Sequence, residues 1–343
     1  MGGNAFAELA PGASFPRMSP EVYNALKATM LARLALLFAH VAVPREAPEK
    51  DDYGDLDLIV AEPLGAREVP LELLKDTLGA VLAIGGSTSN FAVPMPDGPP
   101  DTYVQVDVIK CGTVDKFERV MFFHAYGDLG MILGLIARSY GLSLGHNGLK
   151  IVVGSAEDGE PHSFSLSADF QHIMRFFALD LTLWQAGFAT QRAIFDWVRT
   201  SRLFHPARHR ESTRRMHRRE LSRTMYLNFL QYARELEESG AYDGVEQLVP
   251  ADVVAQAKRE FGKEDEYNAI VQTNRRRAKM KTVFNGHLVM AWTGAQGLAV
   301  RRIMGAVRAV VSEDEMMQMT VEEVEAVVRR VYAELSADEV VSS

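Results

Sequence analysis

The stretch Tyr53-Gly54-Asp55-Leu56-Asp57-Leu58-Ile59-Val60 contains two acidic residues separated by a single leucine. Polar and apolar residues alternate here, which predicts a β-strand over residues 55–62. Because side chains two residues apart share a face of a strand, Asp55 and Asp57 should project together while the leucines face the core. Two adjacent carboxylates repel each other, so such a pair usually has a cation as its partner.

A second alternating stretch, Tyr103-Val104-Gln105-Val106-Asp107-Val108-Ile109, predicts another strand. Its valines share one face, and Asp107 lies on the other. If the two strands are neighbours, Asp55, Asp57 and Asp107 converge. Oxygen ligands of this kind suit Mg²⁺, with Mn²⁺ as an alternative, and two such ions can activate a hydroxyl and stabilise a leaving pyrophosphate. The competing interpretation is a set of solvated acids on the polar face of an antiparallel sheet.

The two strands together resemble the catalytic core of the DNA polymerase β-type nucleotidyltransferase superfamily. More specifically, four segments resemble a family of uncharacterised nucleotidyltransferase-like proteins from fungi and large phages. This resemblance implies the nucleotidyltransferase fold and a two-metal site in which Asp55, Asp57 and Asp107 are the catalytic ligands, and it implies no particular substrate. The segments are Met1-Gly2-Gly3-Asn4-Ala5-Phe6, Lys50-Asp51-Asp52-Tyr53-Gly54-Asp55-Leu56-Asp57, Ser89-Asn90-Phe91-Ala92-Val93-Pro94 and His124-Ala125-Tyr126-Gly127-Asp128-Leu129.

The superfamily carries a hydrophobic-Gly-Gly/Ser signature before the paired acids, where glycine lets backbone amides approach the triphosphate. Two places in this chain are candidates. Gly2 and Gly3 lie upstream of Asp55, which is the expected order, but a long insertion follows them. Gly86 and Ser87 have the literal pattern but lie downstream, where a helix C-cap and turn is the ordinary use of glycine.

The wider pattern predicts an α+β fold. A serine and a proline at residues 19 and 20 begin a helix that should run to about residue 38, and a second helix is expected over 71–82. Beyond residue 167 the spacing of apolar residues is helical. We therefore expect a mixed-sheet nucleotidyltransferase catalytic domain over 1–160 and an all-helical substrate-binding domain over 161–335, with the active site in the cleft between them. Residues 336–343 should be a frayed tail.

Basic residues are concentrated in two stretches of the second half, although the formal net charge of the chain is -8. Such clustering in an acidic protein favours an anion-binding face for RNA, with a solvated helix face or a triphosphate site as alternatives. His205 and His209 lack a third metal ligand at the required spacing, so we assign them to this basic face. The residues expected to contact nucleic acid are Arg208, Arg214, Arg215, Arg218, Arg276 and Lys279.

Composition narrows the cellular setting. Cys111 is the single cysteine, so no internal disulfide can form, which suits the cytosol or nucleus. The most apolar stretch, residues 28–43, is too short and too polar to span a bilayer, so no membrane partner is expected.

These features predict an enzyme that moves a nucleoside monophosphate from an NTP to a hydroxyl. A tRNA-like RNA 3′ end is the favoured acceptor, because residues 284–302 resemble a segment of tRNA CCA-adding enzymes and bacterial poly(A) polymerases. The alternatives are transfer to a protein or small molecule, or a catalytically silent nucleic-acid-binding module. Three intact acids argue against silence.

Overall fold

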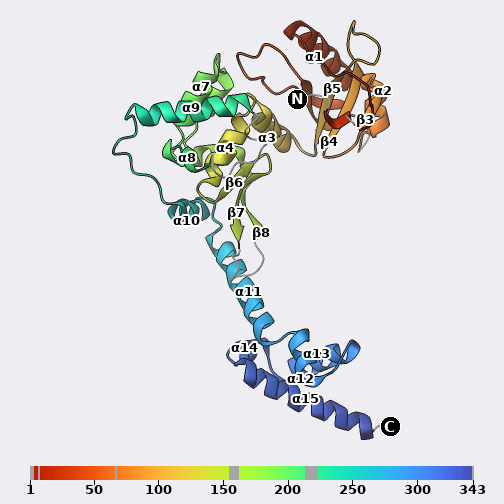
Figure 1. Ribbon diagram of the computed structural model, residues 1–343, viewed down its shortest axis with the longest axis vertical. Coiled ribbons are helices and arrows are strands. Elements are labelled where there is room, and N and C mark those ends of the chain that lie inside the picture. The colour runs from red at the N-terminus through yellow and green to blue at the C-terminus, as the bar shows by residue number, and fades with distance from the viewer. Residues whose placement is uncertain (1–3, 7, 66–67, 154–161, 213–222, 342–343) are drawn as a thin grey trace. The chain divides into compact units, whose positions relative to one another are not determined.

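The computed structural model describes residues 4–6, 8–65, 68–153, 162–212 and 223–341. Contacts divide the chain into two compact units, one comprising Met1–Lys150 with Ser165–Ala257 and the other Ile151–Phe164 with Lys258–Ser343. The protein is of mixed α/β type, with a five-stranded sheet in its N-terminal part and helices in its C-terminal part (Figure 1). This division by contacts is not a division into catalytic and substrate-binding parts, and the domain limits expected from the sequence stay a prediction.

The five-stranded sheet contains both strands expected from the alternating acids. Its order is β1-β2-β5-β4-β3, and β2 and β5 are parallel while the other neighbours are antiparallel. The expected strands at residues 55–62 and 103–111 are confirmed as β2 and β5, which form the middle of the sheet with β4. The strands are β1 (Phe38–Ala42), β2 (Asp55–Pro63), β3 (Leu82–Ile84), β4 (Thr88–Pro94) and β5 (Tyr103–Cys111).

The apolar face of this sheet packs on two helices, α1 (Pro20–Leu34) and α2 (Leu71–Leu78). Leu56 and Leu58 of β2 are fully buried in the same cluster as the alternating valines of β5 and the buried side of α1. Burying this many apolar side chains is the main source of stability for the layer. The acids alternate with these residues and therefore lie on the opposite face.

Two helices end earlier than expected, and in each case an edge strand follows. The helix expected to reach residue 38 ends at Leu34, and Phe38–Ala42 forms β1 against β2. The helix expected over 71–82 ends at Leu78, because Gly79 adopts a left-handed φ of 68° and caps it. A short apolar run is compatible with a helix or a strand, and only its pairing with a distant strand decides which of the two forms.

Beyond the five-stranded sheet, the chain up to residue 260 is mainly helical. Residues 129–138 form the helix α4, and a three-stranded sheet, β6-β7-β8, follows it; the division by contacts runs through β7 and β8. In the described part of the chain no single helix is long and apolar enough to cross a bilayer; α3 and α4 pass that test only together, and they are bent by 94°. The elements are α3 (Val114–His124), α4 (Leu129–Arg138), β6 (Leu142–Gly145), β7 (Gly148–Val153), β8 (His162–Ser167), α5 (Phe170–Phe176), α6 (Leu181–Ala186), α7 (Gln191–Arg199), α8 (Ala207–Ser212), α9 (Thr224–Glu238) and α10 (Pro250–Glu260).

The second unit has its own small core, in which Val289, Val307 and Val328 are fully buried. Its polar helix α11 lies within the region expected to be helical, but its bounds could not be predicted, because only Val283 is buried on it and an apolar stripe is therefore missing. The last helix continues to Val341, beyond the residue at which the apolar pattern stops. The helices are α11 (Glu264–Val283), α12 (Gly286–Thr293), α13 (Leu298–Val310), α14 (Glu313–Met316) and α15 (Val321–Val341).

Candidate active site

The three acids meet at the junction of the parallel strands β2 and β5. Asp57 lies directly opposite Asp107, and Asp55 lies opposite Gln105. All of these side chains point to the same face, because each is an even number of residues from its neighbour on its strand. The apolar residues between them are buried against α1 and α2, so the register cannot slip by one residue without burying the acids.

The surroundings of Asp57 disfavour its charged form. Burial, followed by the charges of Asp55, Asp107 and Glu46, raises the pKa of this carboxyl group to about 7, although Lys50 acts in the opposite direction. An ordinary aspartate titrates about three units lower, near 3.8. The cluster therefore carries more negative charge than its surroundings balance, and a cation bound there would relieve the repulsion.

Asp107 is held by two neutral amides. Asn90 Nδ2 donates to Asp107 Oδ1 at 2.6 Å, and Gln105 Nε2 lies 2.9 Å from each carboxylate oxygen. Asn90 is placed by the antiparallel pairing of β4 with β5, which sets it directly opposite Asp107. Burial raises the pKa of Asp107, and the two amide hydrogen bonds act in the opposite direction. The amides thus favour the charged form and fix its orientation.

Replacing Asn90 by alanine should weaken the site without destroying the fold. The change removes one of the two amides that orient Asp107 and leaves all three acids in place. Loss of a residue that orients a metal ligand typically costs about 10- to 100-fold in metal affinity or activity. We expect a loss of that size in Mg²⁺ affinity and in the nucleotidyl transfer that the sequence predicts, with unchanged circular dichroism. An Asn90→Ala protein with full activity would show that Gln105 alone is sufficient.

A lysine lies beside the acids, in the loop before β2. Lys50 Nζ is 2.6 Å from Glu46 Oε2, and the hydroxyl of Tyr23 donates to Glu46 Oε1 at 2.5 Å. The ammonium group also lies 4.6 Å from the ring centre of Tyr53, which stacks on Tyr23 at 3.9 Å. Since the charges of both Glu46 and Lys50 act on the pKa of Asp57, this loop lies close to the acidic site.

The donor set is suited to a hard divalent cation. Among the described residues, no group of three or more histidine, cysteine, aspartate or glutamate side chains already stands in a metal-binding arrangement. The three side chains nevertheless offer only carboxylate oxygens, which Mg²⁺ prefers, and burial together with the neighbouring acids raises the pKa of Asp57. On this chemistry the residues fit the ions that the resemblance implies.

The two glycine pairs expected to bind the triphosphate lie at different places relative to the sheet. Gly2 and Gly3 lie outside the described residues, but the helical turn that follows them is anchored near β5, because buried Phe6 stacks on Phe15 at 5.5 Å and Phe15 contacts Tyr103. Gly86 and Ser87 form the exposed turn between β3 and β4. Ser87 directly precedes Thr88, which pairs with Ile109. The turn therefore lies roughly 10 Å along the sheet from Asp57, at the end of the strands away from Asp55. Both pairs stay predictions for nucleotide binding.

Of the residues expected to contact nucleic acid, the three that the structure describes are engaged within the chain. Arg208 is the clearest case: it donates to the carbonyls of Ser139 and Leu248, at 3.0 and 2.7 Å, and its guanidinium lies 4.1 Å from the ring centre of Tyr140. In the second unit, Arg276 forms an ion pair with Asp314, and Lys279 donates to the carbonyl of Met317. Arg214, Arg215 and Arg218 lie outside the described residues.

Replacing Arg208 by alanine should therefore reduce stability. The change leaves two carbonyls without their charged donor and removes the cation–π contact, which together are worth roughly 2–4 kcal/mol. Denaturant unfolding measures this loss. Arg301, an exposed arginine of α13, supplies the matched control, whose alanine variant should unfold like the wild type. Equal stability of both variants would contradict the structural role of Arg208.

The assignment of His205 and His209 to an exposed basic face is wrong. Both residues are buried, and burial, reinforced by His205, lowers the pKa of His209 to about 4. The ring of His209 stacks on Phe204 at 5.5 Å. His209 is therefore a neutral core residue, and His205 is buried as well. The sequence-based assignment failed because Pro206 and the flanking arginines are typical of a surface segment.

Sequence reasoning found the acids but missed the residues that support them. Asn90, Gln105, Glu46 and Lys50 belong to β4, β5 and a loop, and no motif singles them out. Only the resemblance that included Asn90 and Lys50 offered a signal.

Comparisons with other proteins do not extend this picture. No model of a known protein family matches the chain, and a search among curated proteins found none with significant similarity. The function of the chain therefore rests on the geometry and chemistry of its own residues.

Proposed function

We propose that this protein is a nucleotidyltransferase, which moves a nucleoside monophosphate from an NTP to a hydroxyl group. The observation that carries the proposal is the register of β2 and β5, which puts Asp57 opposite Asp107 on the face that also holds Asp55. Three carboxylates lie on one face of the sheet, and the pKa of Asp57 is raised to about 7. A bound cation would stabilise the ionised form of such a cluster.

Each acid has a distinct role in this proposal. Asp55 and Asp57 hold both magnesium ions, and Asp107, oriented by Asn90 and Gln105, holds one of them beside the attacking hydroxyl. Bound there, the ions lower the pKa of the hydroxyl and neutralise the charge of the pyrophosphate. The hydroxyl oxygen forms a bond to the α-phosphorus, the bond to the bridging oxygen of the β-phosphate breaks, and the hydroxyl proton passes to a base or to solvent.

The acceptor is proposed to be an RNA 3′ end, on the strength of the arginine-rich stretch over residues 202–223. A small-molecule or protein hydroxyl is the second candidate. One observation favours this candidate. Arg208, Arg276 and Lys279, which were expected to bind phosphate groups of RNA, instead contact other residues of the protein.

Incubation with Mg²⁺, each labelled NTP in turn, and total RNA tests the proposal. The expected result is label in RNA, from a subset of the four NTPs, that disappears with EDTA. Label in a protein or small-molecule fraction of a cell extract would support the second acceptor. Nucleotide binding without transfer to any acceptor would contradict the enzyme and favour a silent binding module.

A further inference from the structure

A long stretch of the second unit carries charge of one sign only. Residues 267–312 include eight basic residues and no acidic one, although the formal net charge of the whole chain is -8. They form most of α11 and all of α12 and α13, in the blue part of the ribbon (Figure 1). Such a local concentration of positive charge in an acidic protein indicates a surface for a polyanion. The eight residues, all of them exposed, are Arg275, Arg276, Arg277, Lys279, Lys281, Arg301, Arg302 and Arg308.

Helix α13 carries three of these arginines on the side that faces away from the core. Val300, Ile303 and Val307 are spaced three or four residues apart, and all three are buried in the core of the unit. Because the helix makes one turn in 3.6 residues, the exposed positions lie on its other side. The arginines at these positions are Arg301, Arg302 and Arg308. The outer side of α13 therefore presents positive charge and no carboxylate of its own.

The end of α11 adjoins this side of α13. Val283 and Phe284 lie in the same core as the buried residues of α13, and the guanidinium of Arg308 lies 5.8 Å from the ring centre of Phe284. Arg277 and Lys281 stand one turn apart on α11, just before that contact. The basic residues of the two helices therefore belong to one part of the unit.

Three of the eight cations are uncommitted. In the part of the chain that the structure describes, the side chains of Arg277, Lys281 and Arg301 form no ion pair and no hydrogen bond. Arg276 and Lys279 differ, because they are engaged with α14 and the residue after it. A phosphate group can bind the three uncommitted cations without displacing a partner.

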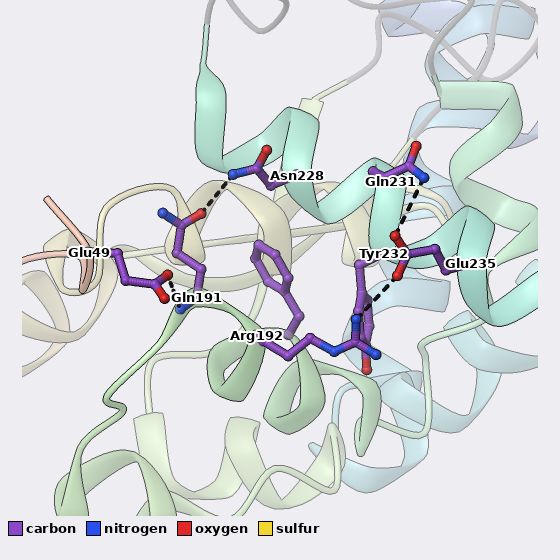
Figure 2. A pocket seen from close by; sticks show the side chains of 8 residues that line it. Glu49, Gln191, Arg192, Asn228, Gln231, Tyr232 and Glu235 are labelled. Atoms are coloured by element: carbon purple, nitrogen blue, oxygen red, sulfur yellow. Dashed lines mark hydrogen bonds and ion pairs between the residues drawn. The ribbon is translucent and has the colours of Figure 1, made fainter.

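Other exposed cations of the chain have a carboxylate beside them. Figure 2 shows one such pair at the rim of a polar pocket between α7 and α9, where Arg192 Nη1 lies 3.2 Å from Glu235 Oε2. A phosphate would have to displace Glu235 to bind there. Two similar pairs lie in the second unit, with distances of 2.6 and 2.7 Å: Lys263 with Glu266, and Arg329 with Glu325.

We propose that the exposed basic residues of α11 and α13, which we call the α11–α13 basic surface, bind the phosphate backbone of RNA. Contacts of this kind fix the position of a nucleic acid without reading its sequence. An anionic membrane is a less suitable partner, since a peripheral helix inserts an apolar face, and the apolar face of α13 is buried in the core. The inference rests on the proposed function in its choice of RNA as the polyanion.

RNA binding tests the inference without the transfer reaction. Fluorescence anisotropy measures the affinity of the full chain for a labelled, single-stranded oligoribonucleotide of mixed sequence, in EDTA and without NTP, over a series of KCl concentrations. Replacing Arg277, Lys281 and Arg301 together by glutamine should remove three phosphate contacts. Each contact on a single strand contributes about 0.7 to the slope of log K against log [KCl], so the slope should become less steep by about 2. At about 0.15 M KCl the affinity should fall roughly 10- to 100-fold.

A second triple variant is the matched control. Arg192→Gln, Lys263→Gln and Arg329→Gln change the net charge by the same amount but remove cations that are already paired. This variant should keep the affinity and the salt dependence of the wild type, and both variants should keep its circular dichroism. Equal losses of affinity in the two variants would show that net charge alone governs binding and would overturn the proposal. Binding of the wild type to anionic phosphatidylserine vesicles but not to RNA would overturn it as well.

The inference and the proposed function can fail separately. RNA binding that depends on the three uncommitted cations, in a protein that transfers from no NTP, would contradict the nucleotidyltransferase and leave the α11–α13 basic surface in place. Transfer to a hydroxyl by a protein that binds no RNA would overturn the inference and favour a small-molecule or protein acceptor.

Discussion

Replacing Asp57 by asparagine should abolish nucleotidyl transfer and, at the same time, stabilise the metal-free protein. The loss of activity should reach at least about 100- to 1000-fold, as expected when a group that stabilises charge in the transition state is removed. The gain in stability follows from the pKa of about 7, which means that the ionised carboxylate is disfavoured in the native state. Near pH 8 this amounts to roughly 2–4 kcal/mol.

Urea unfolding in EDTA measures the second effect, and the labelled-NTP assay measures the first. Asp76→Asn, at an exposed position of α2, is the matched control and should change neither quantity. A variant that is inactive and less stable would indicate that Asp57 supports the fold. A variant that is more stable and fully active would contradict the catalytic role while leaving the electrostatic description intact.

The strands that carry the acids could be predicted because their sequence pattern has a clear physical cause. A period of two in β2 and β5 separates the buried leucines and valines from the acids, and this pattern survives in the three-dimensional structure. The edge strand β1 could not be predicted in the same way. Its residues continue the apolar character of α1, and only pairing with β2 makes them a strand.

The residues that orient the acids could not be predicted from the sequence, for a related reason. Asn90 reaches Asp107 because β4 is hydrogen-bonded to β5, and 17 residues separate the two side chains along the chain. The arginine-rich stretch shows the opposite error. Arg208 looks like a phosphate ligand in the sequence, but its partners Ser139 and Leu248 lie far away along the chain and turn it into a structural residue. Long-range partners therefore decide the role of a charge.

Magnesium should stabilise the wild-type protein more strongly as the pH rises. The folded-state pKa of Asp57 lies above its ordinary value of 3.8, so between about pH 4 and pH 7 the native state binds more protons than the unfolded state. The contribution of Asp57 to the free energy of unfolding must therefore fall as the pH rises through this window and stay low above it. The cation competes with the proton for the same carboxylate.

Thermal unfolding at about pH 5 and about pH 8, with and without Mg²⁺, measures this linkage. The increase in Tm on adding Mg²⁺ should be larger at the higher pH, where Asp57 is ionised before the cation binds. Asp57→Asn should flatten the pH dependence of the metal-free protein and reduce the increase in Tm at both pH values, because it removes both the titrating group and one ligand. The Asp76→Asn control should behave as the wild type does. If Mg²⁺ raised Tm equally at both pH values, and equally in Asp57→Asn, the cation would be binding elsewhere, and the three acids would be a solvated face of the sheet.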